Sequence, residues 1–125
     1  MTIYHAETLF FRIKGWPRYY VSRCGQVLST VGKPCLMKPN IQTKGYRQVE
    51  LYLDKGKPSR LLVHRLVAER FLSLIAGKDQ VNHKDGNQLN NHVSNLEWVT
   101  NRENYRHARE LRFARTRQQR FPFWK

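Results

Sequence analysis

The residues best suited to chemistry in this chain lie in two short polar segments, 82–87 and 95–104. The first begins with Asn82 and His83, and the second begins with Asn95 and reaches Asn104. A neutral histidine can accept a proton, because its unperturbed pKa lies near the pH at which most enzymes work. Amide oxygens are among the oxygen ligands that bind Mg²⁺. A base and a few oxygen ligands for a divalent cation are the groups that hydrolysis of a phosphodiester requires.

Three short elements must bring these residues together. An apolar run that ends at His83 precedes a turn signal at 85–87, and residues 96–99 form a second β-prone run. Thr100 and Glu103 have the spacing of a capping box, in which each side chain bonds the free backbone N–H group of the other residue. The pattern predicts a strand, a loop, a second strand and a helix that starts at about Asn101, with Asn104 in its first turn.

The direct succession of Asn82 and His83 places a geometric demand on this arrangement. Neighbouring residues in a strand point their side chains to opposite faces. Both side chains can therefore reach one site only if the backbone twists or bulges at this point.

Segment 82–104 resembles the ββα-metal core of HNH endonucleases, specifically the branch of phage homing endonucleases. The resemblance rests on residue type and spacing in Asn82-His83-Lys84-Asp85-Gly86-Asn87, Asn95-Leu96-Glu97-Trp98-Val99-Thr100 and Asn104. Val63-His64-Arg65-Leu66-Val67-Ala68 is similar to the lead-in helix of the same branch. A short module often fused N-terminally to these nucleases is similar to Gly15-Trp16, Tyr19-Tyr20-Val21-Ser22, Gly25-Gln26-Val27 and Ser29.

The resemblance implies a hydrolytic DNA endonuclease in which His83 is the general base. It implies that Asn82 and Asn104 hold one Mg²⁺ or Mn²⁺ ion per active site, and that the products carry a 5′-phosphate and a 3′-hydroxyl. Many relatives place an Asp where this chain has Asn82. An Asn gives the metal an oxygen without a negative charge, so we expect weaker metal binding. The ion would then keep more positive charge for the phosphate.

Each of these residues also has a structural alternative. Asn82 could instead bond the local turn, and Asn104 could assist helix capping. Asn95 is expected to bridge backbone groups across the loop, while Asp85 and Asn87 are expected to shape the turn.

The remaining histidines could add to the site or stay outside it. His107 lies three residues after Asn104 on the same helix face, where it could be an extra ligand or a phosphate contact. The surroundings of His64 favour a hydrogen-bonded structural histidine, with a phosphate contact as the alternative. A zinc site made of His83, His92, His107 and a cysteine has no recognisable spacing to support it.

The sequence predicts an α+β fold: a small N-terminal antiparallel sheet, a packing helix, the ββα core and a basic C-terminal helix. Strand and turn signals run over 16–63, with residues 46–53 alternating at period two. An apolar stripe over 64–75 predicts the packing helix, which Gly77 would end. We expect a β module at 1–63, the nuclease core with its lead-in helix at 64–112, and a basic, aromatic tail at 113–125.

Lysine and arginine number 23 against 9 acidic residues, so the formal net charge is +14. Such an excess favours a polyanionic partner, because basic groups set against phosphates release condensed counterions. We therefore expect double-stranded DNA as the partner. The candidate DNA contacts lie on the predicted sheet and helices: Lys38, Lys44, Arg47, Arg60, Arg65, Arg102, Arg106, Arg109 and Arg112.

Two other classes of function stay open. The net positive charge would equally suit a DNA-binding module on a degenerate nuclease core. It would also suit a protein that binds or cleaves RNA. Tyrosines suited to stacking on unpaired bases leave the RNA class open: Tyr19, Tyr20, Tyr46 and Tyr52.

The expected location is intracellular, in the host cytoplasm if a phage encodes the chain. The sequence has no apolar run long enough to span a membrane, and residues 1–11 lack the pattern of a secretory signal. Cys24 and Cys35 do not form a Cys-x-x-Cys pair and are expected to stay reduced in such a compartment.

Overall fold

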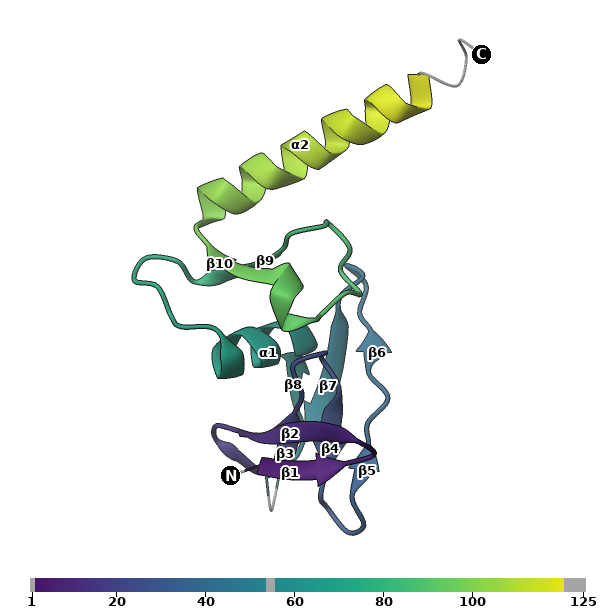
Figure 1. The fold of residues 1–125 in the computed structure, drawn as a ribbon, viewed down its shortest axis with the longest axis vertical. Helices are drawn as coiled ribbons and strands as arrows, with labels where there is room; N and C mark the ends of the chain where they lie inside the picture. The colour runs from purple at the N-terminus through teal and green to yellow at the C-terminus, as the bar shows by residue number, and fades with distance from the viewer. Residues whose placement is uncertain (1, 54–55, 121–125) are drawn as a thin grey trace.

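A computed structural model describes residues 2–53 and 56–120 of this protein, with the backbone alone described at 114–120. The first part of the chain forms a five-stranded antiparallel sheet in the order β1-β2-β3-β4-β5. Its strands are β1 (Thr2–His5), β2 (Thr8–Ile13), β3 (Trp16–Val21), β4 (Val27–Ser29) and β5 (Cys35–Leu36). The expected antiparallel strands around residues 19–29 are confirmed, and the sheet also includes the N-terminal hairpin β1-β2 (Figure 1).

A second, three-stranded sheet follows, with the order β6-β7-β8. Its strands are β6 (Asn40–Ile41), β7 (Arg47–Leu51) and β8 (Ser59–Leu62). The prediction of one sheet over 16–63 is therefore wrong, because the strands separate between Leu36 and Asn40. Pro39 lies in this gap and has no backbone N–H group to donate to a continuous ladder. The expected period-two pattern is present in β7, where Val49 and Leu51 are buried.

Helix α1 (Val63–Phe71) is the predicted packing helix, but it ends earlier than the expected Ile75. Leu72 is extended, and its backbone N–H group bonds the Ala68 carbonyl. In this conformation Leu72 still packs against the core, whereas Leu74 is 75% exposed. The apolar stripe in the sequence predicted a longer helix, but Leu74 has no core to pack against. The helix therefore ends before the stripe does.

The last part of the chain has the predicted strand, loop, strand and helix. Strands β9 (Gln80–His83) and β10 (Leu96–Val99) form a two-stranded antiparallel ribbon, and a short 3₁₀ turn, η1 (Val93–Asn95), precedes β10. Helix α2 (Asn101–Arg120) then extends away from the ribbon (Figure 1). The predicted start at Asn101 is confirmed; residues 121–125 of the expected aromatic tail lie outside the described residues.

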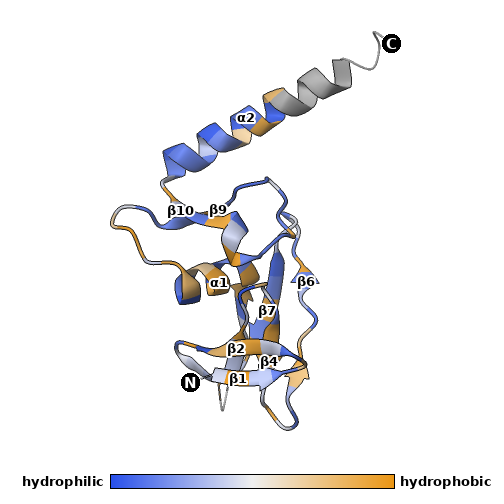
Figure 2. Cartoon of the chain, viewed as in Figure 1, coloured by the Kyte–Doolittle hydropathy of each residue, from blue (hydrophilic) through white to orange (hydrophobic). Residues whose placement is uncertain are grey.

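One apolar core joins the N-terminal sheets to the ribbon. Buried side chains of β3, β7, α1, β9 and β10 share this cluster, among them Val21, Leu51, Val67, Val81 and Trp98. Figure 2 shows apolar residues on α1 and the strands beneath it, whereas α2 is mostly hydrophilic. In the described part of the chain no helix is both long and apolar enough to cross a membrane.

Candidate active site

The β9-β10 ribbon fixes which side chains of the two polar segments can meet. Its register pairs Asn82 with Glu97 and His83 with Leu96 in an unbroken antiparallel ladder. Directly opposed residues share a face and neighbours alternate. Asn82 and Glu97 therefore lie on the outer face, which α2 approaches, and His83 lies on the inner face.

The bulge that would turn both Asn82 and His83 to one face is not present in β9. The two side chains can meet a common substrate only at the end of the ribbon, where β9 stops at His83. The structure therefore has no bulge at Asn82 and His83, and β9 instead ends at His83.

Amide side chains dominate the outer face. Asn82 Nδ2 donates a hydrogen bond to Glu97 Oε2 at 2.9 Å, and Asn104 Nδ2 donates to Gln80 Oε1 at 2.9 Å. Gln80 in turn donates from Nε2 to Asn101 Oδ1 at 3.2 Å. The first turn of α2 is therefore docked on the same face of β9 that carries Asn82.

The two amides that were predicted to hold a metal both use their nitrogen atoms in these bonds. Among the described residues, neither Asn82 Oδ1 nor Asn104 Oδ1 has a hydrogen-bond partner. Carbonyl oxygens are the atoms with which an amide binds Mg²⁺ or Mn²⁺. The chemistry of these two oxygens therefore fits a hard divalent cation.

The start of α2 is held by the predicted capping box. Glu103 Oε1 accepts from the Thr100 backbone N–H at 3.0 Å, and Thr100 Oγ1 accepts from the Glu103 N–H at 3.1 Å. Lys78 Nζ lies 3.3 Å from the same carboxylate. The hydrogen bond from the Thr100 backbone, followed by the one from Lys78, lowers the pKa of Glu103. These contacts fix the turn that carries Asn104.

Further along α2, two more residues face the ribbon and its loop. His107 Nε2 lies 3.1 Å from the Lys84 carbonyl oxygen and can donate to it. A Cβ atom added to Gly86 would lie 2.6 Å from Leu111 Cδ1, so Leu111 packs directly on the loop. His107 thus ties α2 to the residue that follows His83.

On the inner face, His83 is surrounded by aromatic rings and one amide. Its Nε2 lies 2.8 Å from Asn91 Oδ1. Its ring centroid lies 4.9 Å from that of His64 and 5.9 Å from that of Tyr46. His83 is 5% exposed and Asn91 is 4% exposed. Because an amide oxygen can only accept, Nε2 carries the hydrogen in this arrangement and the lone pair is on Nδ1.

His64 differs from the hydrogen-bonded structural histidine that the sequence suggested. Its Nδ1 atom is buried and has no hydrogen-bond partner among the described residues. Burial, and then the positive charges of His83 and Arg65, lower the pKa of His64 from 6.5 to about 4. His64 is therefore a neutral ring beside His83 at pH 7.

The loop between the strands is held by Asn95 and its neighbours. Asn95 Oδ1 accepts from the Asp85 backbone N–H at 3.1 Å, and Asn95 Nδ2 donates to the Asn90 carbonyl at 2.9 Å and to Asp85 Oδ1 at 2.9 Å. Asp85 Oδ1 also accepts from the Asn87 backbone N–H at 2.8 Å. The hydrogen bond from the Asn90 side chain, followed by those from Asn87 and Asn95, lowers the pKa of Asp85. Asn95, Asp85 and Asn87 thus shape one loop that connects the two strands.

Asn91, Glu97 and Gln80 contact the predicted site residues but were not predicted from the sequence. Gln80 could have been found, because it precedes Asn82 by two residues and so shares its strand face. Glu97 could be found only after the strand register was known. Asn91 lies in the loop, where no periodic pattern indicates the direction of a side chain.

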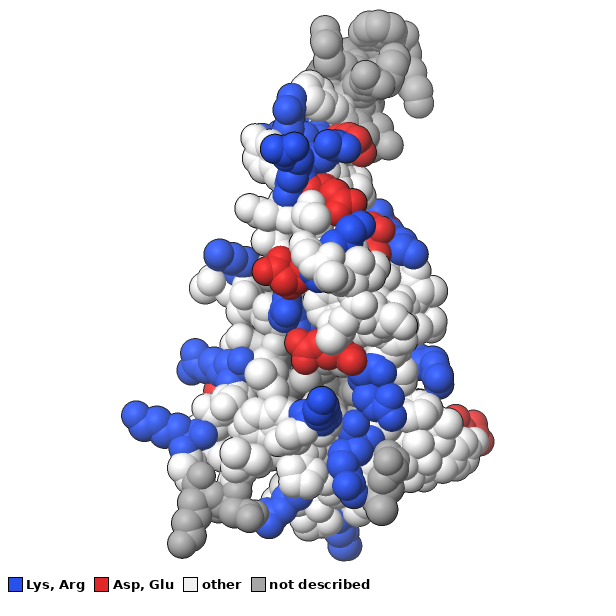
Figure 3. Space-filling model, turned by 90° about the vertical axis from the view of Figure 1, so that its left-hand side faces the viewer, with Lys and Arg blue, Asp and Glu red and all other residues white. Residues whose placement is uncertain are grey.

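Three arginines in the described part of α2 lie on the side of the helix away from Asn104. At about 100° per residue, the side of the helix opposite Asn104 carries Arg102, Arg106 and Arg109, and all three are exposed. Arg112 is also exposed. Figure 3 shows basic side chains over one face of the molecule from the sheets to α2, with acidic side chains among them. These arginines are therefore placed to reach phosphates other than one bound at Asn104.

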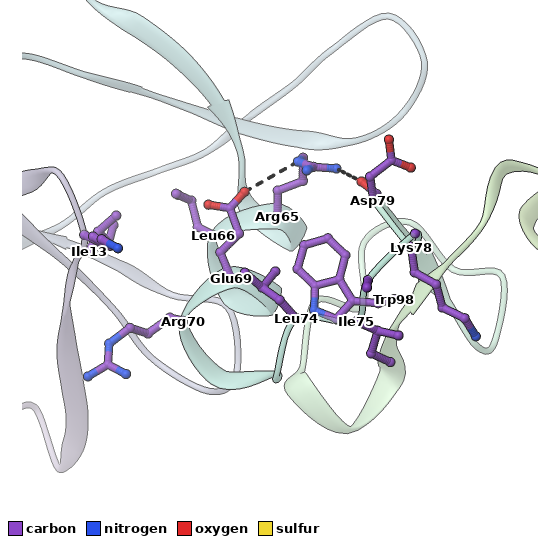
Figure 4. Close-up of a pocket in the computed structure, with 13 residues that line it drawn as sticks. Ile13, Arg65, Leu66, Glu69, Arg70, Leu74, Ile75, Lys78, Asp79 and Trp98 are labelled. Atoms are coloured by element: carbon purple, nitrogen blue, oxygen red, sulfur yellow. Dashed lines mark hydrogen bonds and ion pairs between the residues drawn. The ribbon is translucent and has the colours of Figure 1, made fainter.

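The basic residues before α2 are more varied in their surroundings. Arg65 donates to the Asp79 carbonyl at 3.0 Å, pairs with Glu69 at 3.7 Å and lies over the Trp98 ring, at the edge of a cavity of about 690 Å³ (Figure 4). Arg60 pairs with Glu50 at 3.3 Å.

The last three candidate contacts in the N-terminal part also differ from one another. Lys38 and Lys44 are exposed, while Arg47 is half-buried. The backbone N–H of Lys44 bonds Gln42 Oε1, and Arg47 Nε is buried with no partner among the described residues. Of the candidates before α2, Lys38 and Lys44 are the most available to a partner.

Comparison with known proteins gives consistent matches over this region. Residues 61–106 match a family model described as HNH endonuclease. The chain is 40% identical over 94 residues to YosQ from the SPbeta prophage of Bacillus subtilis (strain 168), covering 74% of this chain and 53% of YosQ. It is 41% identical over 93 residues to the DNA endonuclease I-HmuI of Bacillus phage SP01, covering 74% of this chain and 52% of the relative.

The fold has a solved counterpart as well. A structure described as "DNA binding and cleavage by the HNH homing endonuclease I-HmuI" superposes with a TM-score of 0.71 and 34% identity. The superposition covers 90% of this chain and 64% of that one. The chain thus spans about half the length of YosQ and I-HmuI.

Proposed function

Because this chain contains an HNH endonuclease domain at residues 61–106, we propose that it is a metal-dependent endonuclease that hydrolyses phosphodiester bonds in double-stranded DNA. The observation that carries the proposal is the docking of α2 on β9 through the bond between Asn104 and Gln80. This contact brings Asn104 to the face of β9 that carries Asn82, and His83 is the last residue of the same strand. We place its action inside the cell that holds the DNA, in the host cytoplasm if a phage encodes the chain.

In this proposal His83 is the general base. It takes a proton from water at Nδ1, while the bond from Nε2–H to Asn91 fixes the ring and its tautomer. Tyr46 and His64 pack against the His83 ring and also against each other, with their own ring centroids 5.0 Å apart. Because His64 is neutral at pH 7, it adds no positive charge that would oppose protonation of His83.

Asn82 and Asn104 would hold one Mg²⁺ or Mn²⁺ ion through Oδ1. When bound, such an ion stabilises charge on the phosphate and on the leaving oxygen. The products would carry a 5′-phosphate and a 3′-hydroxyl. Asn95, Asp85 and Asn87 hold the loop on which this geometry depends.

The duplex would be held by basic side chains on α2 and on the N-terminal part. The exposed candidates include Arg102, Arg106, Arg109, Arg112, Lys38 and Lys44. His107 bonds the Lys84 carbonyl and His64 is buried against His83, so these two histidines have structural roles in this proposal.

The tyrosines that left an RNA partner open give it little support. Tyr19 and Tyr20 are buried in the core, and Tyr46 packs against His64 and His83. Tyr52 is 49% exposed. Stacking on unpaired bases needs accessible ring faces, so a duplex partner fits this surface better.

The test is relaxation of supercoiled plasmid with Mg²⁺ or Mn²⁺ against EDTA. Wild type should nick the plasmid only with metal, and His83→Ala should lose roughly 100-fold or more of the rate while keeping DNA affinity. His5→Ala, which also removes a histidine but lies in the N-terminal hairpin β1-β2, is the control. Tight, salt-sensitive binding without cleavage of a cognate site would favour the DNA-binding module, and equal cleavage by wild type and His83→Ala would refute His83 as the base.

A further inference from the structure

Glu97 is an acidic side chain that hydrogen-bonds one of the predicted metal ligands, Asn82. It lies directly opposite Asn82 in the ribbon, is half-buried, and accepts the Asn82 Nδ2 hydrogen bond at 2.9 Å. Its position on the outer face is fixed by the strand register. The carboxylate therefore contacts the Asn82 amide through its nitrogen, on the strand face where Asn104 docks through Gln80.

Glu97 differs from the exposed Glu7 and Glu110 in being half-buried. Glu50, Glu69 and Glu103 each pair with a lysine or arginine. Among the described residues, no basic side chain forms an ion pair with Glu97, although the net charge of the chain is +14. Its negative charge is thus left unneutralised next to the Asn82 amide.

Two amide oxygens alone make a site without negative charge, whereas Mg²⁺ in proteins is usually held through at least one carboxylate. Residues that hydrogen-bond a metal ligand without contacting the metal themselves also affect metal affinity strongly. We propose that Glu97 is a positioning residue of the metal site. It holds the Asn82 nitrogen so that Oδ1 faces the ion, and it supplies beside the ion the negative charge that Asn82 lacks. This inference rests on the proposed function, in which Asn82 and Asn104 ligate the metal.

The test measures Mn²⁺ binding to the full chain without DNA, by the EPR signal of free Mn²⁺. Glu97→Gln keeps an oxygen that can accept the Asn82 bond but removes the charge, and should weaken Mn²⁺ binding about tenfold. Glu50→Gln is the matched control, because it removes a carboxylate from β7 that pairs with Arg60. Thermal unfolding of each variant checks that the fold is kept.

A double-mutant cycle separates the effect of the Glu97 charge from the effect of its hydrogen bond to Asn82. Asn82→Asp should restore Mn²⁺ affinity in the Glu97→Gln background, because one negative charge then returns to the site. In the wild-type background the same substitution should gain less, since two adjacent carboxylates repel each other. Equal gains in both backgrounds would overturn the proposal, because Glu97 would then exert no charge effect on the ion.

The outcomes also separate this inference from the proposed function. If wild type binds Mn²⁺ and cleaves DNA, while Glu97→Gln binds Mn²⁺ as tightly as wild type, the role of Glu97 is refuted and the nuclease stands. If wild type neither binds Mn²⁺ nor cleaves DNA, both proposals fail. A tenfold loss confined to Glu97→Gln supports both.

Discussion

Gly25, in the turn between β3 and β4, lies directly against Asn91, the residue that bonds His83. A Cβ atom added to Gly25 would lie 2.9 Å from Asn91 Cβ and 3.1 Å from the Asn91 carbonyl oxygen. The Val93 N–H also bonds the Arg23 carbonyl at 2.8 Å. The N-terminal sheet therefore supports the inner face of the candidate active site.

Gly25→Ala should therefore reduce cleavage as well as stability. The new methyl group must displace Asn91, which weakens its bond to His83, and we expect the cleavage rate to fall roughly tenfold or more. Gly32→Ala is the matched control, because Gly32 also has a positive φ (79°, against 89° at Gly25) but nothing within 4 Å of its added Cβ. Both variants should lose about 1 kcal/mol of unfolding free energy to backbone strain. Equal cleavage rates in the two variants would contradict the link between Gly25 and His83.

Local sequence rules were sufficient for the ribbon and for the start of α2. Thr100 and Glu103 form the capping box that their spacing predicted, because such a box depends only on residues within one turn. The β1-β2 hairpin was not predicted as such. Its turn residues, Ala6 and Glu7, have positive φ values of 48° and 63°, where Gly or Asn is usual. Residues without turn preference gave no signal there.

The site required information that no local pattern contains. The outer-face pair of Asn82 and Glu97 depends on how β9 and β10 align across a long loop, and a shift of one residue would turn every side chain to the other face. The contact of Asn91 with His83 depends on the position of Gly25, far away in the chain. The sequence thus indicated candidate residues for chemistry and the loop role of Asn95, whereas the contacts of Glu97 and Asn91 could not be found from a local pattern.

The low pKa of His64 should make stability depend on pH. The pKa of His64 is about 4 in the folded protein, against 6.5 in the unfolded chain. As the pH falls, the unfolded chain therefore takes up a proton before the folded protein does. The stability that His64 contributes is complete above about pH 6.5 and is lost between there and pH 4, by a total on the order of 3 kcal/mol. His64→Phe keeps an aromatic ring in place but cannot titrate. Urea unfolding at several pH values should show a shallower loss for this variant, and parallel curves would refute the assignment.

The capping box should connect the stability of α2 to catalysis. Thr100→Ala removes the hydroxyl that accepts the Glu103 N–H and should cost about 1 kcal/mol of unfolding free energy. Because Asn104 lies in the same turn, we also expect weaker Mn²⁺ binding. Thr43→Ala, in an exposed turn between β6 and β7, should change neither quantity. Loss of stability with unchanged Mn²⁺ binding would argue against Asn104 as a ligand.

The arginines on the far side of α2 should hold DNA without taking part in the chemistry. Neutralising Arg102, Arg106 and Arg109 together to Gln should flatten the slope of log binding constant against log salt by up to about three, since each phosphate contact contributes about 0.9. Arg65→Gln is the control, because Arg65 is engaged by Glu69, Asp79 and Trp98, and it should leave the slope unchanged. At low salt and saturating protein, the triple variant should cleave at close to the wild-type rate, because these side chains point away from Asn104. A large loss of cleavage under saturation would instead place them at the reacting phosphate.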